Sequence, residues 1–182
     1  MISHANTVPM LQLSVEEYLS GERSSLVRHE YVSGTVFAMA GCSKRHNVIS
    51  SNVASALRVS RDGITRMADV LVRIDQAFYY PDVMVVCEPN SDAFVETTPC
   101  LIVEVLSDST EAIDRREKLN NYRKISHLKA YVLISQHARL VEVYRRSGIG
   151  WLLETYQADQ VIQLDCPKTD LTLSAIYDGT EL

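Results

Sequence analysis

Two periods of hydrophobic and polar residues alternate along this chain, and each predicts one type of element. A helical period begins after Ser43, which is placed to cap a helix over residues 44–61 that ends at Asp62-Gly63. A second helical period begins after Ser109 or Thr110, either of which can cap it. The apolar stripes of the two helices consist of Ile49, Val53, Ala56 and Leu57, and of Ala112, Leu119, Tyr122 and Ile125.

Runs rich in β-branched residues predict the strands. Three such runs occupy residues 64–74, 81–87 and 101–107, and a fourth occupies residues 130–135. Hairpin-spaced runs then indicate an antiparallel meander appended to the core, at residues 139–146, 151–156 and 161–164.

The amino-terminal part carries two local signals. Ser14 and Glu17 form a capping-box pattern that predicts a short helix. Residues 28–32 and 35–40 flank Ser33-Gly34, which indicates a hairpin.

The central order is therefore helix, three strands, helix and strand. This order predicts an α/β fold, with a mixed β-sheet core flanked by helices and added antiparallel hairpins. A length of 182 residues suits a single domain that spans residues 1–182.

Composition is ordinary for a soluble globular protein, with 46% hydrophobic and 23% charged residues. No apolar run approaches the roughly 20 residues that cross a bilayer, and the first residues lack a signal-peptide pattern, so we expect no membrane partner and a cytoplasmic location. A net charge of −5 argues against a general nucleic-acid coat protein. It does not exclude an enzyme that acts on nucleic acid, because a carboxylate metal site is itself acidic.

Four cysteines are widely scattered and form no C-x-x-C pair: Cys42, Cys87, Cys100 and Cys166. This spacing predicts neither a zinc site nor a disulfide framework. Cys87 and Cys100 fall at strand ends, where we expect reduced, partly buried thiols.

The chemistry centres on Glu104, which interrupts the apolar run 101–106. A buried unpaired carboxylate costs several kcal/mol or more, so Glu104 needs a cation, a metal or a proton. Asp82 begins the preceding strand, and if the two strands are neighbours the two acids approach each other near one end of the sheet. Mg²⁺ (or Mn²⁺) would suit this pair, with the backbone carbonyl of Val105 as a third protein ligand. The alternative for Asp82 is an ordinary turn aspartate after proline.

Lys118 lies at the margin of the second helical stripe, one turn before Tyr122. From there its ammonium could reach an attacking water or a phosphate oxygen and offset the charge that develops during phosphodiester cleavage. An exposed i,i+4 pair with Asp114 is an equally good interpretation of this residue.

These runs resemble the Uma-two family, a bacterial group of restriction-endonuclease-like proteins within the PD-(D/E)XK nuclease superfamily. The resemblance extends from about Ser14 to Tyr177. It is carried by Tyr80-Pro81-Asp82-Val83, by Ile102 to Ser107, by Asp114 to Lys118 with Tyr122, and by Glu30 to Gly34 with Met39 and His46. It implies the α/β/α restriction-endonuclease core, a divalent-metal site and a homodimer.

The resemblance includes one departure from the superfamily, whose lysine stands two residues after the glutamate, where this chain has Leu106. Lys118 is then a migrated lysine supplied by the helix, as in the family itself. Glu30 resembles an additional acid that binds a second metal or holds the attacking water, although a surface hairpin glutamate fits equally well. For His46, which shares a side with Ile49 and Val53, a core or capping role is favoured over a catalytic one.

The leading hypothesis is a Mg²⁺-dependent endonuclease that hydrolyses DNA, with Asp82 and Glu104 as metal ligands and Lys118 as the stabilising cation. The alternative is a catalytically inactive nuclease-fold module that binds nucleic acid or protein, in which Lys118 neutralises Glu104 as a buried ion pair. RNA is a weaker choice of substrate. Sequence preference stays open, because no recognition helix or zinc finger is evident.

Overall fold

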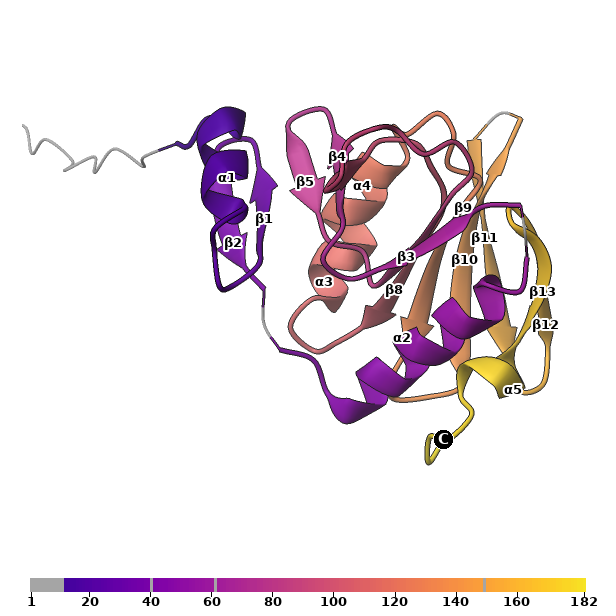
Figure 1. Ribbon diagram of the computed structural model, residues 1–182. Helices are drawn as coiled ribbons and strands as arrows, with labels where there is room; N and C mark the ends of the chain where they lie inside the picture. The colour runs from indigo at the N-terminus through magenta and orange to yellow at the C-terminus, as the bar shows by residue number, and fades with distance from the viewer. Residues whose placement is uncertain (1–11, 40, 61, 149) are drawn as a thin grey trace, which may run out of the picture.

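A six-stranded mixed sheet forms the centre of this computed structural model, which describes residues 12–39, 41–60, 62–148 and 150–182 (Figure 1). The strand order is β11-β10-β9-β8-β6-β3. The pairing of β8 with β9 is parallel, and the other neighbours pair antiparallel. The strands are β3 (Ile64–Met67), β6 (Val83–Val86), β8 (Pro99–Leu106), β9 (Ala130–Ser135), β10 (Leu140–Ser147) and β11 (Gly150–Gln157).

Helices cover both faces of this sheet (Figure 1). The helix α2 (Lys44–Leu57) packs on the face that carries Leu101, Val103 and Val105. The opposite face is covered by a composite helix made of α3 (Glu111–Ile113), a π-helical turn (Asp114–Lys118) and α4 (Leu119–Tyr122). Glu104 alternates with Leu101, Val103 and Val105 along β8, so its side chain lies on the composite-helix face.

A second sheet of five strands has the order β2-β1-β5-β4-β7 and packs beside the composite helix through Val72, Ile74 and Tyr79. Its strands are β1 (His29–Val32), β2 (Thr35–Ala38), β4 (Leu71–Ile74), β5 (Ala77–Tyr79) and β7 (Val95–Glu96). The helix α1 (Val15–Glu22) closes its outer side, where the Tyr18 and Tyr31 rings stack at 4.9 Å. This aromatic contact anchors the hairpin that carries Glu30.

The carboxyl-terminal segment adds a separate two-stranded sheet and a short helix on the α2 side of the molecule. These elements are β12 (Val161–Asp165), β13 (Lys168–Thr172) and α5 (Leu173–Ile176). Ile162, Leu164 and Leu171 join the same apolar core as α2. Within the described ranges, no helix is long and apolar enough to span a membrane.

Several local predictions are confirmed. Ser14 and Glu17 form the capping box of α1, and the Ser43 hydroxyl caps α2 by accepting from the His46 amide at 3.0 Å. Ser33 and Gly34 turn the β1–β2 hairpin, both with positive φ. The α/β fold class and the order of helix, strands, helix and strand in the main sheet also hold.

Other boundaries were wrong. The predicted strand 64–74 is divided at Asp69, whose φ of 66° turns the chain, so that β3 and β4 belong to different sheets. The helix α2 ends at Leu57 and not at residue 61. The expected meander stops at β11, because β12 pairs with β13, a strand that the sequence pattern did not reveal.

The start of the composite helix also differs from the prediction. Thr110 occupies the N-cap position, but its side chain makes no capping hydrogen bond. Instead, the Ser107 hydroxyl accepts from the Thr110 amide at 3.2 Å. Ala112 is exposed, whereas Leu119, Tyr122 and Ile125 are buried as predicted.

The expectation that Cys100 is a reduced thiol was wrong, whereas Cys87 is a free thiol as expected, although it is exposed. Cys100 and Cys166 form a disulfide, with their Cα atoms 6.0 Å apart, and Cys87 lies against it. Strand pairing explains the convergence: β6 and β8 are neighbours, and the β12–β13 turn lies against the ends of these two strands. Spacing along the chain carries no signal of such a contact between distant segments.

Candidate functional site

The two strand acids meet at one end of the β6–β8 pair. The register opposes Val83 to Val103, which places Asp82 beside Glu104 just beyond the last paired residues. The Asp82 amide lies 3.4 Å from Glu104 Oε2, and the Val105 amide donates to Asp82 Oδ2 at 2.7 Å. The strand pattern predicted this approach, and the structure confirms it.

Lys118 reaches the same place from the composite helix. Its ammonium lies 2.9 Å from Glu30 Oε1, 3.2 Å from Glu104 Oε1 and 3.3 Å from Asp114 Oδ1. The alternative of an i,i+4 pair with Asp114 is correct as a contact but wrong as an exposed one, because the residue is only 5% exposed. The amine and the three carboxylates form one buried cluster, which we call the lysine cluster.

The π-helical turn, Asp114–Lys118, determines which side chains face the sheet. A π turn uses i→i+5 hydrogen bonds and so shifts the buried face relative to an uninterrupted α-helix. Asp114 and Lys118 are buried here, while Ala112 is left in solvent. Tyr122 follows four residues after Lys118, and its hydroxyl donates to Glu104 Oε1 at 2.9 Å.

Charge in the lysine cluster is unbalanced, because one ammonium faces several carboxylates. Burial raises the pKa of Glu104 well above its ordinary value; Lys118 opposes this, and Asp114, Asp82 and Glu30 reinforce it. Burial likewise raises the pKa of Asp114 against the effect of Lys118. For Lys118 burial lowers the pKa, but the carboxylates outweigh it and raise the value well above normal. The lysine is therefore held protonated, and three carboxylates against one ammonium favour the uptake of a proton or a cation.

Glu30 enters the lysine cluster from β1. Its side chain is 15% exposed, and its Oε1 also accepts from the Tyr80 amide at 3.2 Å. The interpretation as a surface hairpin glutamate is therefore wrong. The stacked aromatic contacts beneath the hairpin hold this carboxylate against Lys118.

His46 approaches from the other face of the sheet, in the first turn of α2. Its Nε2 lies 3.2 Å from Asp82 Oδ2. Burial lowers the pKa of His46, but the Asp82 carboxylate and the Val105 carbonyl raise it by more, so the net shift is upward. The sequence favoured a core or capping histidine over a role at the site, whereas the structure places the ring beside Asp82.

The Asp82–Glu104 corner offers oxygen atoms that the protein leaves open. Asp82 Oδ2 is engaged by Val105 and His46, while Oδ1 has no hydrogen-bond partner among the described residues. Among the described residues, Glu104 Oε2 has only the long contact with the Asp82 amide. The Val105 backbone lies at the same corner, where its amide donates to Asp82 Oδ2. Together with the excess of carboxylates over ammonium groups, these hard oxygen donors fit Mg²⁺ or Mn²⁺.

Sequence reasoning did not assign Asp114 and Tyr122 to the site. Asp114 belongs to the lysine cluster through its contact with Lys118, and Tyr122 contacts the cluster through Glu104. Their spacing was the available signal, since Asp114, Lys118 and Tyr122 recur every four residues along one helix.

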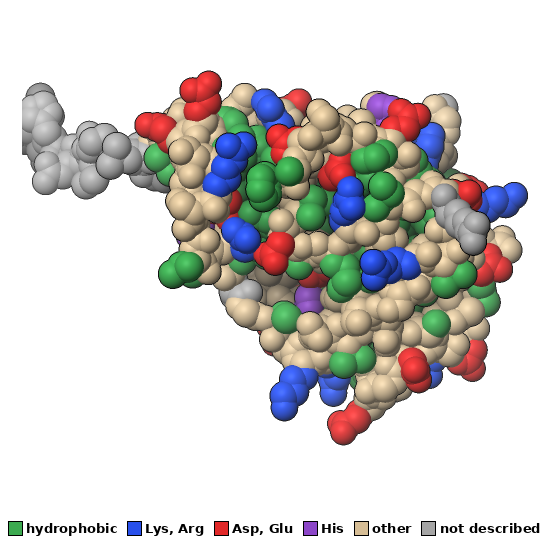
Figure 2. Space-filling model, viewed as in Figure 1, with side chains coloured by type: hydrophobic (Ala, Val, Ile, Leu, Met, Phe, Trp, Pro, Cys, Tyr) green, Lys and Arg blue, Asp and Glu red, His purple; other side chains and the backbone are tan. Residues whose placement is uncertain are grey.

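Surface charge is mixed on the face drawn in Figure 2. On the described part of the face drawn in Figure 2, Lys and Arg side chains are interspersed with Asp and Glu side chains. This mixture agrees with the net charge of −5. A nucleic acid approaching this face would meet individual cations and not a continuous basic surface.

This chain is similar to one protein family and to two relatives of known sequence. The family Uma2, described as "Putative restriction endonuclease", matches residues 15–175. Two relatives from Synechocystis sp. are uncharacterized proteins. The protein slr1290 is 37% identical over 98% of each chain, and sll1609 is 33% identical over 78% of this chain and 85% of its own.

A solved structure shares the fold. It is the crystal structure of a protein from Anabaena variabilis described as a putative nuclease belonging to DUF820. Its TM-score is 0.76, and the match covers 91% of this chain and 97% of that chain at 16% identity. At this identity the likeness shows the fold alone.

Proposed function

This chain belongs to the Uma2 family, and from the geometry of its carboxylate corner we propose that it is a divalent-metal-dependent endonuclease that hydrolyses DNA phosphodiester bonds. The observation that carries the proposal is the convergence of Asp82 and Glu104 beside the single buried amine of Lys118. Carboxylates that close together repel each other, and a divalent cation relieves the repulsion.

Asp82 and Glu104 are the proposed metal ligands, with the Val105 carbonyl as the third. A bound Mg²⁺ or Mn²⁺ supplies an acidified water and stabilises negative charge on the phosphate. The Asp82 side chain is 22% exposed, whereas that of Glu104 is 4% exposed. Substrate would therefore approach from the Asp82 side, and Glu104 would hold the cation from the buried side.

His46 and Val105 act as positioning groups in this proposal. Both contact Asp82 Oδ2, which fixes the carboxylate plane and leaves Oδ1 directed to the cation and solvent. Tyr122 holds Glu104 in the same way, by donating to Oε1 and leaving Oε2 for the cation.

Lys118 has three ammonium protons and three carboxylate neighbours. It therefore holds the acids in place and offsets charge, and a direct contact with a phosphate oxygen requires one of these pairs to open. The pair of Lys118 with Glu30 is the best placed to open, because the Glu30 side chain is the most exposed of the three carboxylate neighbours.

The second candidate function is a catalytically inactive nuclease-fold module that binds nucleic acid or protein. One observation favours it: Lys118 is almost fully buried and already paired, as in an ion pair that needs no metal. A homodimer and a cytoplasmic location remain predictions, and light scattering on the purified protein tests the first.

The experiment combines metal binding with cleavage. Plasmid, linear and branched DNA, and RNA as a comparison substrate, are incubated with the protein and Mg²⁺ or Mn²⁺. Metal binding is followed separately as a rise in melting temperature, since a ligand that binds only the folded state stabilises it by mass action. The proposal expects cleavage of DNA and a metal-dependent rise, both lost in Asp82→Asn and Glu104→Gln.

Glu16→Gln is the matched control, because Glu16 is an exposed acid on α1. It should cut DNA and bind metal like the wild type. Cleavage that persists in Asp82→Asn and Glu104→Gln would locate the activity elsewhere. A wild type that neither cuts nor gains stability with metal would support the inactive module.

A further inference from the structure

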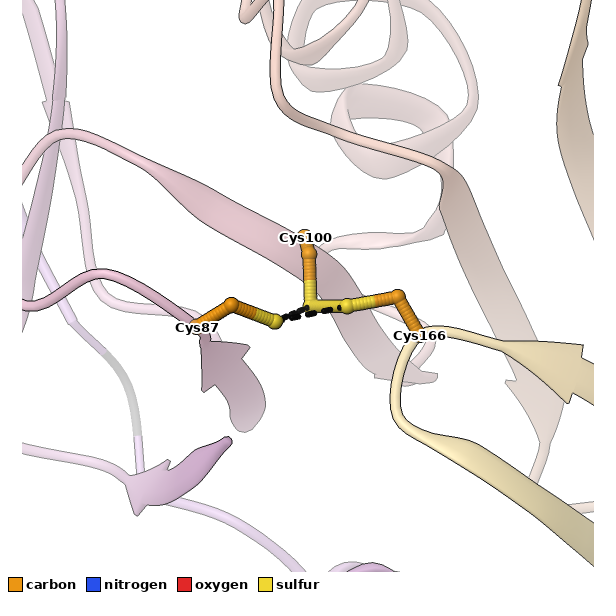
Figure 3. Close-up of side chains that lie close together, drawn as sticks. All are labelled: Cys87, Cys100 and Cys166. Carbon is orange, nitrogen blue, oxygen red and sulfur yellow. Dashed lines mark hydrogen bonds between the residues drawn. A yellow bond between two sulfur atoms is a disulfide. The ribbon is translucent and has the colours of Figure 1, made fainter. Parts of the chain in front are cut away.

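A second group of chemically reactive side chains lies away from the carboxylate corner. Cys87, Cys100 and Cys166 have sulfur atoms that all lie within 4.8 Å of one another. Figure 3 shows the three side chains converging from three separate segments. Cys87 follows β6, Cys100 belongs to β8, and Cys166 lies in the turn between β12 and β13.

We propose that, once a thiol reductant has cleaved the Cys100–Cys166 disulfide into two thiols, Cys87, Cys100 and Cys166 bind one Zn²⁺ as thiolates. The ion would join the β12–β13 hairpin to the ends of strands β6 and β8 in the main sheet. Each thiol releases its proton on binding, so three Zn–S bonds form and three protons leave. The site is independent of the proposed nuclease function.

The position of Cys87 is the first argument. Its sulfur lies 2.9 Å from that of Cys100 and 2.7 Å from that of Cys166, and it is bonded to neither. Even two carbon atoms, which are smaller, rest at roughly 3.5–4.0 Å. Three sulfurs therefore compete for one small volume. Thiolates that share a tetrahedral ion, each about 2.3 Å from it, spread to roughly 3.8 Å apart.

The backbone supports the three side chains before any ion arrives. Antiparallel pairing of β6 with β8 ends at Val86 and Pro99, which sets Cys87 and Cys100 side by side. Pairing of Asp165 with Lys168 closes the turn that carries Cys166. The binding residues thus come from two tight local structures that the apolar core already holds together.

The surroundings favour a cation. Asp62 and Glu88 lie near the Cys87 sulfur. Their carboxylates attract a cation to this place. Cys87 is exposed, so the fourth position of a tetrahedral ion remains open to water.

Ligand softness separates this site from the carboxylate corner. Thiolates select Zn²⁺ or Cu⁺, whereas carboxylates and carbonyls select Mg²⁺ or Mn²⁺. Cys100 and Glu104 both belong to β8, and four residues of strand place them roughly 13 Å apart. Metals can therefore be assigned to one site or the other by type.

The test uses reduced full-length protein, desalted without oxygen and titrated with Zn²⁺ or with Co²⁺ as a spectroscopic probe. Expected results are one ion per chain, a thiolate-to-cobalt charge-transfer band and a higher melting temperature. Cys87→Ser and Cys166→Ser should each weaken binding at least tenfold. Cys42→Ser is the matched control, because Cys42 is also exposed but lies outside the cluster, and it should bind as the wild type does.

Two results would overturn the proposal. One is a reduced wild type that binds no Zn²⁺ or Co²⁺ while its melting curve shows that it is folded. The other is a Cys87→Ser variant that binds as tightly as the wild type. Peptide mapping of the oxidised protein adds a discriminating readout. If Cys87 is found in disulfides and the reduced protein binds no metal, the cluster is a site of thiol–disulfide exchange and not a zinc site.

Discussion

Replacing Lys118 with Met should destabilise the metal-free protein far more than neutralising its partner Glu104 by Glu104→Gln. Lys118→Met keeps the length of the side chain but removes the ammonium, which lies within 3.3 Å of three carboxylates. Glu104→Gln removes one negative charge instead. It leaves Lys118 paired with Glu30 and Asp114, and the new amide oxygen can still accept from Tyr122.

The structure sets the expected magnitudes. Removing one partner of a buried ion pair costs about 3–5 kcal/mol, because an uncompensated charge stays behind. For a protein of this size that loss lowers the melting temperature by roughly 6–20 °C. Glu104→Gln relieves surplus charge while it weakens one contact, so its effect should stay within about 1 kcal/mol of zero.

Urea unfolding in EDTA measures both variants by linear extrapolation. Lys124→Met is the matched control, because Lys124 is 55% exposed and lies 3.8 Å from Asp75, a pair worth little. Equal losses in Lys118→Met and Glu104→Gln would refute the idea that one lysine neutralises several acids. So would a loss for Lys118→Met no larger than that of Lys124→Met.

Three further predictions concern the Glu104 contacts and two glycines elsewhere in the fold. Tyr122→Phe removes the hydroxyl that donates to Glu104 and should lower the free energy of unfolding in urea by about 1–2 kcal/mol; no loss would show that this contact is dispensable. Because the folded-state pKa of Glu104 lies above its unfolded value, the stability it contributes is present below the unfolded pKa and is lost as pH rises through the folded pKa. In EDTA the wild type should therefore lose stability relative to Glu104→Gln from about pH 5 upward, and a constant difference in melting temperature would contradict this. Gly63→Ala should lower the stability of the protein by about 1–3 kcal/mol in thermal melts, since its new Cβ would lie 2.7 Å from a Val85 methyl. In the same assay Gly21→Ala should raise the stability by up to about 1 kcal/mol, because its Cβ meets nothing within 4 Å and alanine favours the helix α1.

Elements with a single plausible period were predictable from the sequence. Apart from Glu104, the run 101–106 is apolar on both faces, which predicts a strand that is covered on both sides. The alternation of side chains along a strand then determines which face carries Glu104. The run 64–74 failed because β-branched residues continue across Asp69, where a left-handed backbone turn sends β4 to another sheet. Asp69 itself was the available signal, because aspartate is depleted in strands and tolerates a left-handed backbone.

Prediction of the site followed the same logic. Glu104 lies in an apolar run, so the sequence offered no exposed position for it. Glu30 lies in a predicted hairpin, so a solvent-exposed position and a position in the site fitted the sequence equally well. The composite helix was treated with a period of 3.6, so Ala112 was expected inside, and the π turn buried Asp114 instead. The cysteine cluster was beyond sequence reasoning, because its members converge only through strand pairing across 13 and 79 residues.

The fold explains how the migrated lysine that we propose can reach the site. Leu106, the position at which the resemblance would place the lysine of the wider superfamily, lies on the same face of β8 as Glu104 and belongs to the core under the composite helix. An amine can therefore reach the glutamate either from the strand or from the helix that covers that face, without any change in the position of Asp82. The helix route adds one consequence. Lys118 brings its own helical carboxylate, Asp114, into the cluster, and the π turn must stay packed for both to reach Glu104. In this chain a change in the packing of the composite helix would therefore also change the charge of the site. A lysine on the strand would keep its place beside Glu104 whatever the helix does.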